Sequence, residues 1–250
     1  MIKYNKRTLD GGMKNMNYIS KDKLLPTIIL LHFIIFGSLH TIPFIINIPV
    51  FPIDLLLKFP VERWLVWVVP SVVLIKLFEK SLYINLKDMF FNKVKLKTCL
   101  RYLVPIILYL VGGIIFTKLT NFSLSEPLRK FANIEEFLSV FSEKAYLSLI
   151  VPAIPEEIVF RGWIQNALLG SRPNKKKVIS AIILSNIMFV IIHLPTFFNS
   201  NYSIVQMLLS GIMVFILGSV FGIIFIKSKN ILVPIFFHWL CDTITFTFYN

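Results

Sequence analysis

The most constraining feature of this 250-residue chain is a run of 49 consecutive uncharged residues between Lys177 and Lys227. About 20 apolar residues are enough for a helix to cross a bilayer. The run therefore predicts two membrane-spanning helices, at about 178–197 and 203–226, joined by a polar turn. A second uncharged run, 30 residues between Lys23 and Asp54, predicts a first span at about 25–46.

Four further apolar segments complete the predicted topology, with spans at about 61–78, 102–117, 145–170 and 231–249. The second of these seven spans is the shortest, because Arg63 and Lys76 leave only 12 uncharged residues between them. Its charged ends are expected to snorkel toward water. Only 16% of the residues are charged, whereas soluble domains carry about a quarter. The sequence therefore predicts an all-α fold, a polytopic transmembrane helix bundle of about seven spans.

The net charge of +13 has a topological explanation. Basic and neutral connections alternate along the chain. The basic ones carry net charges of +4, +5, +4 and +2, and they are residues 1–23, 76–101, 172–177 and 227–229. Lysine and arginine accumulate on the cytoplasmic side of membrane proteins. We therefore expect the N-terminus inside and the C-terminus outside, membrane lipids as the surroundings, and no nucleic-acid partner.

The chain is expected to divide into three parts. Residues 1–23 form a basic cytoplasmic tail, residues 24–144 hold spans one to three with an outer connecting segment, and residues 145–250 hold the remaining spans. In the outer connection, Asn133 and Glu136 resemble a capping box, which predicts a surface helix leading into the fourth span. Trp64 and Trp67 are expected to anchor the second span at the interface.

Ionisable side chains lie inside the last predicted spans, where each costs roughly 2.5–3.5 kcal/mol on insertion scales and is a functional candidate by default. They are Glu156, Glu157, Arg161, His193, His238 and Asp242. Glu157 and Arg161 are four residues apart and are expected to form an ion pair on one helix face. Glu156 lies about 100° around the helix, so Arg161 does not readily serve both carboxylates.

Two prolines precede the carboxylates, Pro152 and Pro155. They predict a broken helix, with Pro155 starting a half-helix that carries Glu156 and Glu157 in its first turn. The helix dipole favours negative charge there. Broken helices inside membranes line wet cavities, and an ionised carboxylate beside water can act as a general base.

The histidines occupy two other spans. His193 follows Phe189 by four residues, and its role stays open between a helix–helix hydrogen bond and catalysis. His238 and Asp242 share a face of the last span, so Asp242 is expected to orient the His238 ring. His32 stands alone on the first span and is expected to be structural. Small residues on the sixth span, Gly211, Gly218 and Gly222, predict close helix packing.

The order Glu156-Glu157-x-x-x-Arg161, Phe189-x-x-x-His193, His238-x-x-x-Asp242 resembles the CPBP intramembrane protease family. That family includes the type II CAAX prenyl endopeptidases and the bacterial bacteriocin-processing and self-immunity (Abi) proteins. The resemblance covers about residues 145–248.

The resemblance implies a catalytic set of Glu156, His193, His238 and Asp242, with Glu157, Arg161 and Phe189 as supporting motif residues. Glu156 and His193 would activate a water, and His238 and Asp242 would stabilise the oxyanion. An Asp at the last position donates a hydrogen bond only when protonated, so orienting His238 suits Asp242 better. Metal involvement stays open: if a zinc ion is present, Glu156, His193 and His238 are the candidate ligands.

The expected function is that of an intramembrane endopeptidase acting on a peptide or a membrane-associated protein. Five Ala against 24 Phe indicate an AT-rich bacterium, hence a multi-pass protein of the bacterial plasma membrane that processes a bacteriocin, pheromone or leader peptide, or confers self-immunity. The alternatives are a non-catalytic immunity or scaffold protein, a small transporter, and, for a eukaryotic or archaeal chain, CAAX-type processing of prenylated proteins.

Overall fold

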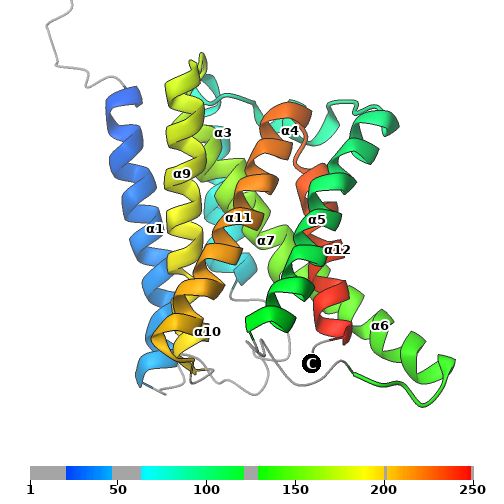
Figure 1. Ribbon diagram of the computed structural model, residues 1–250. Coiled ribbons are helices and arrows are strands. Elements are labelled where there is room, and N and C mark those ends of the chain that lie inside the picture. Colours follow the sequence, from blue (N-terminus) through cyan, green and yellow to red (C-terminus); the bar gives the residue numbers. More distant parts are fainter. Residues whose placement is uncertain (1–20, 47–62, 121–128, 200–201, 249–250) are drawn as a thin grey trace, which may run out of the picture.

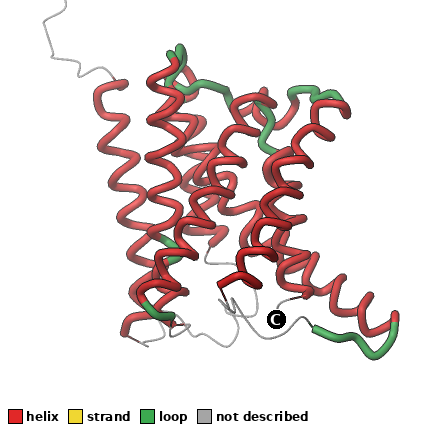
Figure 2. The backbone as a smooth tube through the Cα atoms, viewed as in Figure 1, coloured by secondary structure: helices red, strands yellow, loops and turns green. Residues whose placement is uncertain are grey.

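The computed structural model describes residues 21–46, 63–120, 129–199 and 202–248. Within these ranges all regular structure is helical (Figure 2). The larger elements are α1 (Lys21–Ile46), η1 (Arg63–Val68) with α3 (Val69–Leu77), α5 (Leu96–Thr120), α6 (Ile134–Ser148), α9 (Lys175–Ile191), α11 (Ile204–Ser228) and α12 (Leu232–Phe248). The predicted all-α fold is therefore confirmed for this part of the chain. Most of the predicted basic tail, residues 1–20, lies outside it.

Three helices are long and apolar enough to cross a membrane: Ile134–Leu169, Lys175–Phe198 and Ile204–Ser228. Two shorter apolar helices are Leu24–Ser38 and Leu232–Phe248. Each of the seven predicted spans coincides with a helix or with a run of consecutive helical segments. Several apolar helices in one chain are the organisation of a multi-pass membrane protein.

The fourth helical run consists of α6, η3 (Leu149–Ala153), α7 (Ile154–Glu157), η4 (Ile158–Gln165) and α8 (Asn166–Leu169). Its later part, from α7 to α8, is the buried central helix of the bundle, whereas α6 projects from one end (Figure 1). All eight residues of η4 are buried, and Trp163 is fully buried. The surrounding helices α1, α5, α9 and α11 instead expose leucine and isoleucine side chains. Apolar side chains on the outside and a polar, charged helix inside suit a lipid environment.

The predicted break at Pro152 and Pro155 is wrong, because the helix continues through both prolines. Residues 149–153 and 158–165 adopt π-helical turns, and Ala153 and Ile154 keep right-handed helical dihedral angles. A proline removes one backbone donor and clashes with the carbonyl four residues earlier. A π turn places the hydrogen-bond partner five residues away instead, as when the Ile154 N–H bonds to Leu149 O.

His193 lies within the apolar helix Lys175–Phe198, as predicted, at a two-residue turn that separates α9 from α10 (Leu194–Asn199). Pro195 is the second residue of α10 and has no N–H to donate to the end of α9. The His193 N–H bonds to Val190 O, three residues earlier, at 3.0 Å. The chain therefore turns at His193 before it continues as α10.

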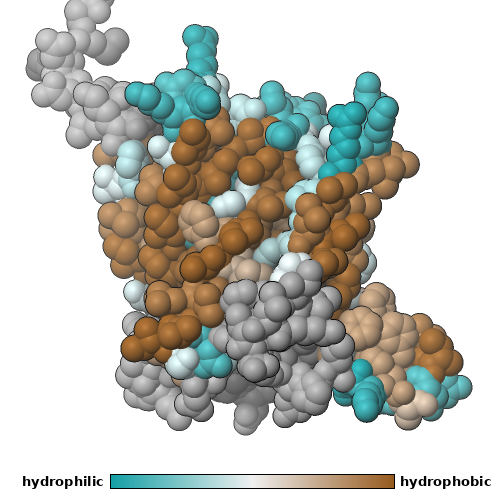
Figure 3. Space-filling model, in the orientation of Figure 1, coloured by the Kyte–Doolittle hydropathy of each residue, from teal (hydrophilic) through white to brown (hydrophobic). Residues whose placement is uncertain are grey.

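One end of the bundle gathers the basic segments. Figure 1 shows the start of α1, the connection between α3 and α5, the start of α9 and the end of α11 at the same end. Hydrophilic residues cluster there in Figure 3, above a broad hydrophobic surface. We call residues 76–101, 170–177 and 227–231 at this end the basic end. Helix α6 lies toward the opposite end (Figure 1).

Candidate active site

The carboxylates Glu156 and Glu157 lie on the central helix, with 4% and 0% of their surface exposed. Pro155 precedes them and has no N–H for Val151 O, and the Ile154 N–H bonds to Leu149 O rather than to Ile150 O. Side chains of η1 replace these donors. Trp64 Nε1 donates to Ile150 O at 3.0 Å, and Arg63 Nη1 donates to Val151 O at 3.3 Å. The irregular turn that presents the carboxylates is thus held by the second helical segment.

The predicted ion pair between Glu157 and Arg161 is confirmed. Arg161 Nη1 lies 3.0 Å from Glu157 Oε1, and both side chains have no exposed surface. Arg161 Nη2 donates to the carbonyl of Gly218 at 2.9 Å, and the guanidinium lies 4.6 Å from the centre of the Phe189 ring. Arg161 is therefore fixed by α9 and α11 as well as by its own helix.

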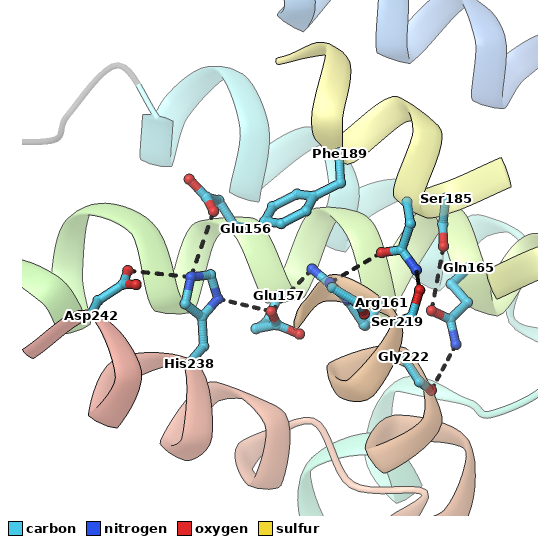
Figure 4. Close-up of polar contacts among 12 residues, drawn as sticks. Glu156, Glu157, Arg161, Gln165, Ser185, Phe189, Ser219, Gly222, His238 and Asp242 are labelled. Carbon is cyan, nitrogen blue, oxygen red and sulfur yellow. Dashed lines mark hydrogen bonds and ion pairs between the residues drawn. The ribbon is translucent and has the colours of Figure 1, made fainter. Parts of the chain in front are cut away.

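A single imidazole, that of His238 on α12, meets three carboxylates (Figure 4). Its Nδ1 lies 2.9 Å from Glu157 Oε1, and its Nε2 lies 3.3 Å from Asp242 Oδ2 and 3.8 Å from Glu156 Oε2. Because a carboxylate only accepts hydrogen bonds, Nδ1 donates to Glu157. The expected contact with Asp242 is present, but the shortest contact of the ring is with Glu157, which the sequence did not indicate.

The second helical segment contributes a residue that the sequence reasoning assigned to a snorkelling span end. Arg63 Nη1 lies 2.9 Å from Glu156 Oε1. Its guanidinium also lies 5.0 Å from the centre of the Trp67 ring. Trp67 is fully buried, so its predicted role as an interfacial anchor is wrong. The available signal was a charged residue at the edge of an apolar segment, and nothing in the spacing linked it to Glu156.

His193 is only indirectly connected to this cluster. Its Nδ1 lies 2.8 Å from Phe189 O, one helical turn earlier. A carbonyl only accepts, so Nδ1 carries the proton and the lone pair is on Nε2. The Phe189 ring lies 4.8 Å from the His193 ring and 6.3 Å from the His238 ring, centre to centre. Within the described residues no hydrogen bond or ion pair joins His193 to Glu156 or His238.

The three candidate zinc ligands named from the sequence do not converge on one point in the structure. Within the described ranges no group of three or more His, Cys, Asp or Glu side chains is arranged to hold a metal ion. His193 is bonded to its own helix, and both nitrogens of His238 face carboxylates. Glu156, His193 and His238 therefore do not fit a zinc site in this arrangement, and the chemistry is derived from protein groups alone.

A row of polar contacts continues the site along the central helix toward the basic end. Gln165 Nε2 donates to the carbonyl of Gly222 at 3.0 Å, as Arg161 does to Gly218 one turn earlier. Ser185 on α9 donates to Gln165 Oε1 at 3.4 Å, and Asn186 donates to Ser219 at 3.1 Å (Figure 4). These bonds satisfy buried polar groups that would otherwise be costly.

The close helix packing predicted at Gly211, Gly218 and Gly222 is present. Polar side chains of neighbouring helices fill the space beside Gly218 and Gly222. A Cβ at Gly218 would lie 2.5 Å from Asn186 Oδ1, and a Cβ at Gly222 would lie 2.6 Å from Gln165 Oε1. Their carbonyls are exposed to Arg161 and Gln165 because no side chain covers them. Gly211 is less crowded, with Val190 Cγ1 at 3.4 Å as the contact.

The comparisons with known proteins agree with the motif. Residues 142–244 match the family model described as type II CAAX prenyl endopeptidase Rce1-like. These residues therefore form an Rce1-like type II CAAX prenyl endopeptidase (CPBP) family domain. No curated protein and no solved structure matches the chain. The buried cluster of Glu156, Glu157 and His238 lies within the matched residues and fits an active site.

Proposed function

We propose, starting from the Rce1-like CAAX prenyl endopeptidase domain of residues 142–244, that this chain is an intramembrane endopeptidase. The observation that carries the proposal is the buried His238 imidazole among three carboxylates, with Glu157 at 2.9 Å, Asp242 at 3.3 Å and Glu156 at 3.8 Å. Such a set is costly in a membrane protein unless it serves a function. It supplies a base, a hydrogen-bond donor and the groups that orient it.

In the proposed reaction, Glu156 is the general base. Its carboxylate takes a proton from a water molecule while the water oxygen attacks the carbonyl carbon of the scissile peptide bond. The resulting oxyanion accepts a hydrogen bond from Nε2–H of His238, which carries protons on both ring nitrogens. The Nδ1–H of the same ring donates to Glu157, and Asp242 lies beside Nε2. The proton on Glu156 then passes to the departing amine as the C–N bond breaks. Glu156 ends the cycle as a carboxylate, and the two products carry the new carboxyl and amino ends.

The role that the resemblance assigns to His193, activating the water together with Glu156, remains part of the proposal. The free lone pair on His193 Nε2 supports it, because that nitrogen can accept a proton or a hydrogen bond from substrate or water. The Phe189 ring contacts both the His193 ring and the His238 ring. We therefore propose that His193 and His238 meet the substrate from different sides.

The substrate proposed is a peptide or the end of a membrane-associated protein. The family membership of residues 142–244 implies a peptide or protein substrate. The composition favours a bacterial plasma membrane, hence processing of a bacteriocin, pheromone or leader peptide, or self-immunity. The gathering of basic segments at one end of the bundle supports an N-terminus inside and a C-terminus outside.

The test replaces Glu156 by Gln, and separately His193 by Ala, in the full chain. We expect each variant to insert normally and to lose cleavage of a membrane-peptide library by about 10²–10⁴-fold, the usual contribution of a general base. Matched controls are His32→Ala, a histidine on α1 that is remote in sequence from the motifs, and Glu79→Gln, a half-buried carboxylate paired with Lys76. Both controls should keep full cleavage. A Glu156→Gln chain that keeps its cellular phenotype would instead support a non-catalytic scaffold.

A further inference from the structure

One cation of the site comes from outside the residues that match the family. Arg63, in η1, lies 93 residues before Glu156 and 79 residues before the start of the matched domain. Its side chain is 23% exposed, and that of Glu156 is 5% exposed. The contact of 2.9 Å is within the range of a charge-assisted hydrogen bond. The Arg63 guanidinium therefore points inward to Glu156, whereas an arginine at the end of a span is expected to extend toward water.

The Arg63 guanidinium is held on three sides. It donates to Val151 O at 3.3 Å, one of the carbonyls that Pro155 leaves unsatisfied, and it lies over the buried Trp67 ring at 5.0 Å. The neighbouring Trp64 indole anchors Ile150 O at 3.0 Å. Arg63 therefore has little freedom to follow Glu156, so the orientation of the Glu156 carboxylate follows that of Arg63.

The two glutamates have separate cations. Glu157 pairs with Arg161 and Glu156 pairs with Arg63, each through one nitrogen and one oxygen at 2.9–3.0 Å. A buried carboxylate without a cation would be strongly disfavoured. Because Arg161 is occupied by Glu157, Gly218 and Asn186, Arg63 is the arginine that pairs with Glu156 among the described residues.

From these contacts we infer that Arg63 is a positioning residue of the site, which fixes the Glu156 carboxylate toward the substrate. The inference rests on the proposed function, since Glu156 is the proposed base. It makes the second helical segment part of the catalytic unit, so that residues 142–244 do not hold the complete site. Arg63 Nη1 contacts Oε1 of Glu156, which leaves Oε2, the oxygen 3.8 Å from His238, to take the proton from water.

The first experiment measures the pair without using activity. The full chain is purified in detergent as wild type, Arg63→Gln, Glu156→Gln and the double variant, and each is melted. Breaking a buried pair leaves an unpaired charge, so each single variant should melt roughly 5–10 °C below wild type. The double variant should melt above both single variants, because no charge is left unpaired. Additive losses would overturn the inferred pairing.

The second experiment measures the consequence for catalysis with Arg63→Gln, Arg63→Lys and the control Lys76→Gln. Lys76 is a cation of the same helical segment whose side chain is 67% exposed and pairs with Glu79. We expect Arg63→Gln to lower kcat by about 10²-fold with KM changed less than threefold, because the base is misplaced by about an ångström. Arg63→Lys should recover part of kcat, and Lys76→Gln should equal wild type.

The outcomes separate the two proposals. Suppose that the melting temperatures show the expected coupling between Arg63 and Glu156, but the wild-type chain cleaves no peptide. That result would overturn the proposed function. An active wild type in which Glu156→Gln is inactive but Arg63→Gln keeps full kcat would overturn only the role of Arg63. An effect of Arg63→Gln confined to KM would also overturn it, because a positioning residue for the base acts on the chemical step.

Discussion

At the scale of residues, the site is a chain of charges rather than a set of separate motifs. Arg63, Glu156, His238, Glu157 and Arg161 follow one another at 2.9–3.8 Å, and Asp242 meets His238 at 3.3 Å. Each member is held by its neighbours, because buried polar groups are costly unless they are fully paired. A change at either end of the chain should therefore reach the imidazole in the middle.

Replacing Gly218 by Ala tests whether a change beside Arg161 affects the rest of the site. In Gly218→Ala, the new Cβ would lie 2.5 Å from Asn186 Oδ1 and 3.0 Å from Arg161 Nη2. Both groups are hydrogen-bonded and cannot retreat freely, so we expect a loss of about 1–3 kcal/mol in stability and a lower kcat. Thermal melting and cleavage rates measure the two effects.

The matched control for Gly218 is Gly112→Ala on α5, where an added Cβ meets nothing within 4 Å. Alanine is the better helix former, so this variant should be as stable as wild type or slightly more stable, and fully active. Equal behaviour of the two variants would show that the space beside Gly218 is not needed by Arg161.

At the scale of elements, the central helix shows what the sequence could and could not predict. Helical spacing was sufficient for the Glu157–Arg161 pair, which is local. The break predicted at Pro152 and Pro155 is wrong, because the sequence does not say whether a proline breaks a helix or is accommodated in a π turn. That outcome depends on donors from elsewhere, here Arg63 and Trp64.

Long-range contacts were beyond sequence reasoning for the same reason. The Glu157–His238 contact joins residues 81 apart, and the Arg63–Glu156 contact joins residues 93 apart. The sequence showed that each group needs a partner, but the packing of the helices determines which partner it receives. Likewise, the sequence placed His193 inside a span but did not predict the turn at residues 192–193, where Pro195 lacks the backbone donor.

Pro155→Ala tests the role of the irregular turn. The restored N–H would compete with Trp64 and Arg63 for the carbonyls of Ile150 and Val151, and the turn should relax toward an ordinary helix. Stability should change little, because the gain from removing a proline inside a helix is opposed by the loss of the buried contacts of Glu156 and Glu157. The kcat value should fall, because Glu156 and Glu157 rotate away from His238.

Pro105→Ala is the control for that experiment, since Pro105 lies inside α5, away from the carboxylates in sequence. Its replacement should leave cleavage unchanged. Measuring the melting temperature and kcat of both variants separates an effect on helix stability from a displacement of the Glu156 and Glu157 carboxylates. Full activity of Pro155→Ala would mean that the π turns do not set the position of the carboxylates.

At the scale of the whole molecule, the charge distribution and the helix packing agree. The apolar faces of α1, α5, α9 and α11 are on the outside. The ionisable residues of the site come from the buried central helix, from α12, from η1 and from the turn after α9. The basic end collects segments that are far apart in the sequence (Figures 1 and 3). The alternation of loop charges predicted this gathering before any packing was known, because consecutive spans return the chain to the same side.

The orientation in the membrane is testable with single cysteines in a chain whose Cys99 and Cys241 are replaced by Ala. Ser171 lies at the basic end and Ser139 lies on α6, toward the opposite end, and both are exposed. With the basic end inside, a membrane-impermeant maleimide applied to intact cells should label Ser139→Cys and not Ser171→Cys. Permeabilised cells should show labelling of both, which controls for reactivity. Labelling of Ser171→Cys alone in intact cells would reverse the proposed orientation and place the N-terminus outside.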